Sequence, residues 1–354
     1  MSTSAVGRRR DRHHFIPQYL LRAFTFAAKK GRRHVHVYRR DEQHFPATTV
    51  NVAVGGGFYD GPSEVDVEAS LDKKEDRYAR FLQACEIGPP DPATAAEFLV
   101  HLAMRTKNVR DSLTKTFEVG IDAVKELAGG PDFENYLNSL LLKQLKKWDR
   151  TRAGPLFRRQ LGLPEAGKIK KIPRGVLVRL LQGNQPGDLI RAFLDLALAQ
   201  KPIKTMAAEA HHEAMVGIVT DPNGPARAAE LQKLTWRVVA PKGGLLILGD
   251  ICSFAVPAAS PTTFVPLVAP AASETLAAYL PIGPDLLLLG SRGDWVDSAN
   301  VLNEASAGLS RDFFVSAFHD AALLALSHTI DTAPAYVSKE QLHDSIPKHL
   351  RERT

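Results

Sequence analysis

The chain of 354 residues carries a formal net charge of +6 at pH 7; 44% of its residues are hydrophobic and 24% are charged. This globular composition excludes wholesale disorder, and the length fits one large domain or two closely packed ones. Two cysteines, Cys85 and Cys252, exclude a disulfide framework and lack metal-knuckle spacing, which favours a reducing compartment. Prolines interrupt the most apolar region, 254–272, and no secretory leader opens the chain, so we expect a cytoplasmic protein without a membrane span.

The positive charge is concentrated near the N-terminus. Residues 1–40 contain eleven lysines or arginines and a single acid, Asp11. Such a region attracts phosphate backbones independently of base sequence, because binding releases condensed counterions. We therefore expect a basic tail over residues 1–12 and nucleic acid as the partner of this region. The alternative is a solvated basic tail and loop that keep the protein soluble.

The next segment, 13–61, predicts a short helix and two strands. Pro17 suits a first helical position. The apolar face of this helix is formed by Leu20, Leu21 and Phe24. Alternation in HVHVYRR, 34–40, and in TTVNVAV, 48–54, indicates two strands that pair as a small antiparallel unit. The glycines at 55–57 end this unit as a flexible turn, since they lack the flanking elements and the lysine of a phosphate-binding loop.

From residue 62 to residue 235 the apolar residues recur at helical spacing, with Ser63 as the candidate cap of the first helix. The stripe of this first helix consists of Val67, Leu71, Tyr78 and Leu82. Later helices are expected over 92–127, 132–148, 175–183 and 187–218. Gly and Pro residues separate these segments, so this part of the chain predicts a helical body.

From Trp236 onward short apolar runs predict strands, which are followed by a long helix over 297–328. The strand candidates are 236–240, 244–250, 254–257 and 285–291. The whole pattern predicts an α+β fold with an N-terminal helix and strand pair, a central helical body, and C-terminal strands plus a long helix. We expect one composite domain over 13–354, because neither end has enough apolar surface to fold alone. Its three segments are 13–61, 62–235 and 236–335.

Several of these segments resemble a known family in the same order. HHFIPQYLLRAF at 13–24, VHVYRR at 35–40 and VNVAVGGGFYD at 50–60 are similar to the N-terminal signature of the bacterial domain-of-unknown-function family 4238. The similarity continues through a helix with Glu68 and Glu75, LAMRTKNVR at 102–110, Trp236, and the runs 246–250, 279–290 and 301–308. The resemblance covers nearly the whole chain and implies no particular activity.

One loop departs from the pattern of that family, which has Ser or Thr, Asp, an amide residue and Pro there. This chain has Gly249, Asp250, Ile251 and Cys252, so only the carboxylate is retained. Carboxylates at strand ends commonly face a cleft, which makes Asp250 a catalytic candidate. A turn-forming aspartate is the alternative.

The adjacent histidines His13 and His14 are the first site candidates, because imidazole serves as general base, general acid or metal ligand near neutral pH. They precede a helix start, where free N–H groups favour an anion such as phosphate. Adjacent residues in an extended segment point opposite ways, so one histidine at most faces a given pocket. The alternative is a structural pair that caps the helix or packs against it.

Further candidates lie close to the histidines in the sequence. Gln18 and Arg22 share one face of the short helix and could hold an oxyanion together, whereas Gln18 could instead only close the helix start. Gln18 is counted with the catalytic candidates, and Arg12 and Arg22 are the phosphate-binding candidates. We expect His13 or His14 to line a concave, basic pocket with Gln18 and a carboxylate.

Glu68 and Glu75 are seven residues apart and share one edge of a helix. Glu75 falls beside the apolar stripe, and Arg105 follows a helix segment that is apolar almost all round, so we expect these two buried charges to pair. A structural Glu–Arg bridge is one interpretation, and a carboxylate pair that supports a divalent metal is the other. His211, His212 and Glu213 point in different directions from a helix and are interpreted as incidental.

Two classes of function fit these residues. The first is a phosphodiester hydrolase, most simply a nuclease, with His13 or His14 as the base and basic residues that hold the phosphate. One of three carboxylates, Glu68, Glu75 or Asp250, would bind a divalent metal or orient the imidazole. HHFIP has a short similarity to the histidine motif of His-Me finger nucleases, although a helix follows at once, and Asn51 with His34 or His36 could replace the missing ligands only in an altered arrangement. The second is a non-enzymatic regulatory protein that binds nucleic acid or an acidic protein. The hydrolase requires a histidine of the pair and one of the three carboxylates in a single pocket.

Overall fold

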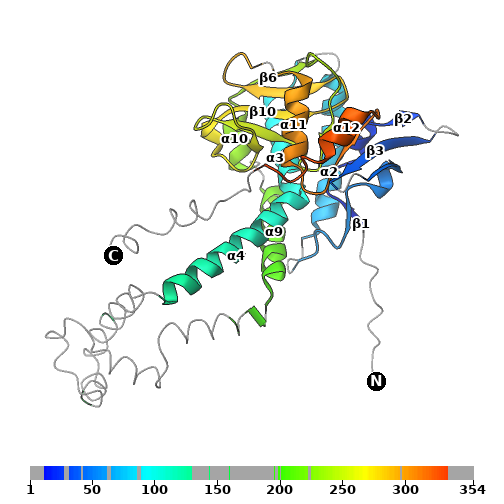
Figure 1. Ribbon diagram of the computed structural model, residues 1–354. Coiled ribbons are helices and arrows are strands. Elements are labelled where there is room, and N and C mark those ends of the chain that lie inside the picture. Colours follow the sequence, from blue (N-terminus) through cyan, green and yellow to red (C-terminus); the bar gives the residue numbers. More distant parts are fainter. Residues whose placement is uncertain are drawn as a thin grey trace, which may run out of the picture. The chain divides into compact units, whose positions relative to one another are not determined.

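The computed structural model describes most of the first and last thirds of the chain. The described residues are 12–27, 32–40, 43–61, 65–85, 89–129, 201–221, 225–295 and 297–333, with the single positions 143, 159, 195, 198 and 199. The chain divides into two compact units, Met1–Leu113 with Ala207–Tyr336, and Thr114–Met206 with Val337–Thr354 (Figure 1). The predicted cap Ser63 and the predicted helices 132–148 and 175–183 fall outside the described residues, apart from position 143, which is helical.

The first unit has the predicted α+β fold and contains an antiparallel sheet of five strands (Figure 1). Its strands in spatial order are β6 (Thr235–Val239), β11 (Leu287–Ser291), β10 (Thr275–Pro281), β8 (Phe254–Pro257) and β9 (Val265–Pro266). The expected strands at 236–240, 254–257 and 285–291 are therefore confirmed. The central strand β10 was not among the predicted strands, because TLAAYLP is buried on both faces and lacks the apolar–polar alternation of a half-exposed strand.

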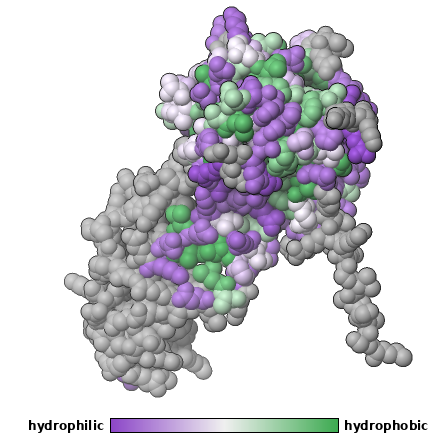
Figure 2. Space-filling model, turned by 45° about the vertical axis from the view of Figure 1, so that its right-hand side comes forward, coloured by the Kyte–Doolittle hydropathy of each residue, from purple (hydrophilic) through white to green (hydrophobic). Residues whose placement is uncertain are grey.

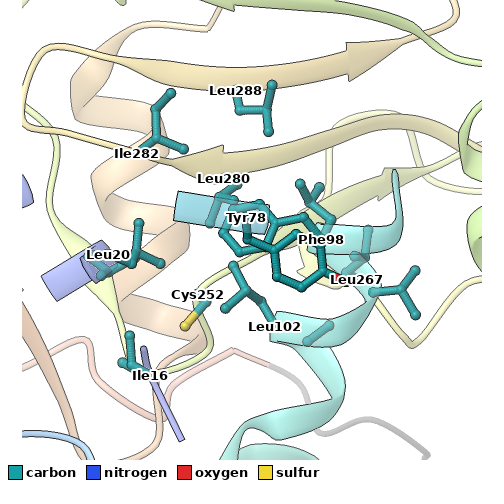
Figure 3. Close-up of a cluster of buried hydrophobic side chains, with 14 of the residues drawn as sticks. Ile16, Leu20, Tyr78, Phe98, Leu102, Cys252, Leu267, Leu280, Ile282 and Leu288 are labelled. Carbon is teal, nitrogen blue, oxygen red and sulfur yellow. The ribbon is translucent and has the colours of Figure 1, made fainter. Parts of the chain in front are cut away.

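Helices cover both faces of this sheet, since successive side chains of a strand point to opposite sides. Tyr279 and its same-face neighbours pack with Leu302 of helix α11 (Ala299–Leu309). Leu280 and Leu288 belong instead to the largest core cluster, together with Phe98 and Leu102 of helix α3 (Pro92–Arg105). Figure 3 labels these four side chains. Other described helices are α2 (Val67–Cys85), α4 (Lys107–Gly129), α9 (Ile203–Thr220) and α10 (Ala226–Leu231), with the short 3₁₀ segment η4 (Ala272–Glu274).

A second sheet joins distant parts of the sequence. Its strands in order are β2 (Phe26–Ala27), β3 (Arg33–Arg39), β12 (Phe313–Ser316) and β7 (Leu248–Gly249). A further strand, β4 (His44–Thr48), pairs with the edge of β3 that lies opposite to β12. Val37 is the register partner of Val315 and contributes to the main core with helix α1 (Gln18–Ala23). Tyr38 and Phe314 point to the opposite face, where they pack against α12 (Ala321–Ser327).

The largest core cluster unites the three segments expected from the sequence. It contains Ile16 from the N-terminal segment, Phe98 from the helical body and Leu280 from the C-terminal strands (Figure 3). Both cysteines are buried, and Cys85 and Cys252 belong to this cluster as packing residues. Among the described residues, no helix is both long enough and apolar enough to cross a membrane.

Three local predictions are corrected by the structure. The expected long helix over 297–328 is interrupted by strand β12, because Phe313, Phe314 and Val315 are buried between two sheet neighbours and favour extended backbone. The strand that pairs with β3 in the expected N-terminal strand pair is β4, not 48–54. Within 48–54, Thr49–Asn51 forms a 3₁₀ turn. The turn expected at 55–57 begins only at Gly57, because its first two glycines lie in β5 (Val54–Gly56), which pairs with β1 (Arg12–His14).

Smaller differences concern helix ends. Pro17 is the N-cap of α1 and precedes the helix by one residue. The expected helix 92–127 is two helices, because Thr106 has extended backbone and separates α3 from α4. Of the expected helix over 187–218, the structure describes α9 and the helical positions 195, 198 and 199.

A group of stacked imidazoles occupies the face of β3 that carries Tyr38. His36 Nδ1 lies 2.8 Å from His44 Nε2, the rings of His44 and His319 stack at 3.9 Å, and Tyr38 Oη lies 2.7 Å from His319 Nδ1. Burial first, and then the neighbouring His44 and His319, lowers the pKa of His36 to about 4. Parallel rings direct their nitrogen lone pairs into parallel planes, and no group of three His, Cys, Asp or Glu side chains in the described part of the chain has the arrangement to hold a metal.

We predict that this cluster makes folding sensitive to acid. The unfolded chain protonates His36 near its ordinary pKa of about 6.5, whereas the folded chain does so near 4, so the unfolded state binds more protons between these values. This stability is fully present above pH 6.5 and is lost as the pH falls toward 4. Urea unfolding at pH 7.5, 6 and 5 measures the free energy of unfolding. This free energy should fall less between pH 7.5 and pH 5 for His36→Phe than for the parent. His328→Gln, which alters an exposed histidine outside the cluster, should behave as the parent does.

Candidate functional site

The buried guanidinium of Arg105, which is 3% exposed, joins three elements of the first unit. Its Nη1 donates to Glu75 Oε1 at 2.6 Å, its Nε donates to the Tyr59 hydroxyl at 3.0 Å, and its Nη2 donates to the His14 carbonyl at 2.8 Å. Burial alone would lower the pKa of Arg105, but Tyr59 and Glu75 outweigh that effect and raise it. The expected Glu75–Arg105 pair is confirmed.

The two histidines of the opening motif enter this network differently. His13 is 7% exposed, stacks on Tyr59 with ring centroids 5.3 Å apart, and accepts a hydrogen bond at Nδ1 from the Tyr59 backbone N–H at 3.0 Å. His14 contributes its carbonyl to Arg105 and to the Tyr59 hydroxyl, the latter at 3.3 Å. Strand β1 thus holds Tyr59 and Arg105 in place through one ring and one carbonyl.

Two further histidines contact the same region and were wrongly interpreted as incidental. His212 Nδ1 lies 2.7 Å from the Tyr59 carbonyl, and His211 Nε2 lies 2.8 Å from the Met104 carbonyl. Both rings are buried, whereas Glu213 is exposed. A side chain on Gly61 would overlap the ring of His212, with a Cβ only 2.1 Å from its Cγ. These adjacent residues of α9 point in different directions, and each contacts the backbone carbonyl of a different segment. Helical periodicity alone does not indicate which segments lie beside a helix.

Glu68 is a carboxyl group in an unusual environment. Its Oε2 atom is buried and has no hydrogen-bond partner among the described residues. Burial raises the pKa of Glu68 to about 7, with Arg105 opposing this effect and the carboxylates of Asp72 and Glu75 adding to it. A carboxyl group that titrates near neutral pH has the property required of a general acid or base.

Asp250 holds the link between α11 and β12. The carboxylate is 3% exposed and accepts backbone N–H groups from Arg311 at 2.9 Å, Asp312 at 2.7 Å and Phe313 at 3.3 Å. Burial raises its pKa to about 6, and these three hydrogen bonds oppose that rise. Such contacts are those of a structural carboxylate at a turn, and a catalytic role for Asp250 stays a prediction.

The other predicted residues lie at the surface or in strand β1. Arg22 Nη2 donates to Gln18 Oε1 at 3.4 Å on the exposed side of α1, so these two residues share a face as expected. Arg12 is the register partner of Gly56. The roles assigned to these residues in catalysis and phosphate binding stay predictions.

A concave pocket of about 730 Å³ opens on the first unit. Five cations and two carboxylates line it, around an apolar floor: Arg39, Arg40, Lys107, Arg110, Arg311, Asp111 and Asp312, with Phe15, Phe45, Phe58 and Phe313 among the apolar residues. Its lining contains neither histidine of the opening motif, nor Gln18, nor any of the predicted carboxylates. On the face shown in Figure 2, hydrophilic and hydrophobic side chains of the described residues lie interspersed.

The buried Arg105 network supports one wall of this pocket. Gly55 and Phe58 line the pocket, while His13 is the register partner of Gly55 and Tyr59 follows Phe58 in the chain. The guanidinium of Arg110 lies 5.4 Å from the centroid of the Phe58 ring. His13 of the opening motif therefore lies directly behind the pocket wall and helps to fix its backbone, while Phe15 of the same motif lines the pocket.

The segment RTKNVR at 105–110 directs charge into the pocket. Asn108 Nδ2 donates to the Leu309 carbonyl at 3.0 Å and anchors the start of α4. Lys107 and Arg110 are three residues apart, so they lie on neighbouring positions of one helix face, and both line the pocket. Lys107 Nζ is 2.5 Å from Asp312 Oδ2, and both side chains are more than 40% exposed.

Comparison with known proteins places the chain in a family. Residues 12–301 match the family model described as Protein of unknown function (DUF4238). The chain therefore belongs to this family, as its opening signature predicted. No curated protein and no solved structure matches the chain.

We predict that Arg105→Ala destabilises the first unit by roughly 3–5 kcal/mol, because it leaves the Glu75 carboxylate, the Tyr59 hydroxyl and the His14 carbonyl without their shared donor. Arg77→Ala is the matched control: that arginine also pairs with a glutamate, Glu97, but its side chain is 47% exposed, so about 1 kcal/mol or less should be lost. Urea unfolding followed by circular dichroism measures both. Equal losses for the two variants would contradict this role.

Proposed function

We propose that this protein binds nucleic acid, and that the basic pocket of the first unit holds its phosphates. The observation that carries the proposal is the excess of cations among the described residues of the lining, where five lysines or arginines face two carboxylates. Arg39 and Arg40 belong to the basic N-terminal region, which on sequence grounds attracts phosphate. The other cations come from α4 and from the link before β12.

The ion pairs already present in the pocket leave its cations available to a ligand. Lys107 pairs with Asp312, and Arg40 lies 3.5 Å from Asp331 with 59% of its side chain exposed. Exposed ion pairs contribute little free energy, so a phosphate can replace the carboxylate at modest cost. A volume of about 730 Å³ is within the range of pockets that hold small molecules. It therefore accommodates a nucleotide-sized part of a longer strand.

The composition of the lining supports binding better than hydrolysis. A hydrolytic pocket needs a general base within hydrogen-bonding reach of the attacking water. The described residues of the lining include no histidine, and their carboxylates are Asp111 and Asp312, of which the second is paired with Lys107. The regulatory or binding class is therefore favoured for this pocket.

We predict that Lys107→Gln and Arg40→Gln each weaken binding of a fluorescently labelled oligonucleotide. Each should also reduce the slope of the logarithm of the binding constant against the logarithm of the salt concentration by about one, which corresponds to the loss of one phosphate contact. Fluorescence anisotropy at 50 and 200 mM salt measures both quantities. Lys233→Gln is the matched control, because this exposed lysine also pairs with a carboxylate, Glu230, but does not line the pocket. The proposal fails if the parent does not bind at 50 mM salt, or if both pocket variants bind as Lys233→Gln does.

A phosphodiester hydrolase is the second candidate, and Glu68 is the observation that favours it. This carboxyl group combines a buried, unpartnered oxygen with a pKa of about 7, and it interacts electrostatically with Arg105. His14 contacts the same guanidinium through its carbonyl. In this candidate function, Glu68 would act as the general acid or base.

We predict for this candidate that the parent cleaves single- or double-stranded DNA or RNA with Mg²⁺ or Mn²⁺, and that Glu68→Gln lowers the rate at least 100-fold while it keeps the parental affinity. His13→Ala and His14→Ala are tested for cleavage and by thermal melts. A variant that loses cleavage but keeps its melting temperature indicates a chemical role for that histidine, whereas a lower melting temperature indicates a structural role. Absence of cleavage by the parent under all these conditions would remove the hydrolase and leave the binding function.

A further inference from the structure

We infer that the basic pocket selects single-stranded over double-stranded nucleic acid, because Arg39 and Phe45 at its edge form a stacking platform for an unpaired base. This inference rests on the proposed function and adds to it the class of nucleic acid and the residues that determine it.

Phe45 is the one aromatic side chain of the pocket lining with substantial exposure. It is 36% exposed, whereas Phe15, Phe58 and Phe313 are 6 to 7% exposed and belong to the core. At the edge of a basic pocket, this ring is exposed to the same solvent region as the cations of the lining. Its exposed area is therefore available to a planar ligand.

The guanidinium of Arg39 lies over this ring, with its central carbon 5.6 Å from the ring centroid. The β3–β4 pairing fixes the two side chains, since Phe45 is the register partner of Val37 and the Arg39 N–H donates to the Gln43 carbonyl at 3.0 Å. Both residues line the pocket. Nucleobases stack on aromatic rings and on guanidinium planes, so this pair offers a base either surface.

Arg39 also differs from three of the other cations in its electrostatic partners. Within the described residues no carboxylate lies within 4.0 Å of its guanidinium, whereas Arg40, Lys107 and Arg311 each have one. A guanidinium that has no carboxylate partner can donate to a phosphate while its flat side contacts a base. One residue can thus bind both parts of a nucleotide.

The stacking surface discriminates between strands because the bases of a duplex are paired and stacked on one another. A base can reach Phe45 only if it is unpaired, and each such contact strengthens binding to single strands without any sequence preference. Cations alone would bind both forms.

The test compares binding of a labelled 12-nucleotide single strand and the corresponding duplex by fluorescence anisotropy. The parent should prefer the single strand. Phe45→Ala should weaken single-strand binding about tenfold and leave duplex binding within twofold, while Phe45→Trp should restore single-strand binding. Arg39→Lys keeps the charge but loses the planar group, so it should reduce the preference without changing duplex affinity.

Val50→Ala is the matched control, because Val50 is 50% exposed in the segment after β4 but does not line the pocket. Circular dichroism melts exclude loss of the fold in each variant. If Lys107→Gln weakens binding but Phe45→Ala weakens both nucleic acids equally or neither, the inference is wrong and the proposed function stands. If the parent binds neither nucleic acid, the proposed function fails and the inference fails with it.

Discussion

The arrangement of the first unit depends on one buried cation. A guanidinium removed from water needs hydrogen-bond acceptors for its donors, and an uncompensated charge in the interior is costly. Arg105 meets this requirement only when the carboxylate of Glu75, the hydroxyl of Tyr59 and the carbonyl of His14 converge on it. Helix α2, the segment after β5 and strand β1 are therefore fixed relative to α3 by a single side chain.

The cation has consequences beyond its own contacts. Tyr59, held by Arg105, also accepts a contact from His212 at its carbonyl and receives the ring of His13 on its own ring. Phe58, next to it in the chain, forms part of the pocket floor. The most specific part of the family signature thus stabilises the wall of the pocket, and the charges that face the pocket come from other segments.

Some of this could be predicted from the sequence. The Glu75–Arg105 pair was predictable because a charge follows a helix segment that is apolar almost all round, and such a charge needs a partner. Strands β6, β8 and β11 were predictable from short apolar runs. Strand β12 was not predictable, because it has only four residues and lies between the helices α11 and α12, whose periodicity suggests one continuous helix.

The pocket itself could not be predicted, for a different reason. Its cations come from β3, α4 and the link before β12, and no local pattern relates Arg39 to Lys107 or Arg311. Sequence spacing indicates which residues share a face of one element, but it does not indicate which elements meet. The pairings of His211 and His212 escaped prediction in the same way, since their partners lie in other segments.

The pairing of β3 with β12 has a consequence for synthesis of the chain on the ribosome. Val37 is made early, whereas its register partner Val315 emerges only after most of the remaining chain has been translated, on the order of tens of seconds later. During that time β3 can pair with β4 but presents much of its other edge, with unpaired N–H and C=O groups, to other nascent chains. Charged side chains at the ends of an exposed strand disfavour such pairing, and Arg33 and Arg39 stand at the two ends of β3.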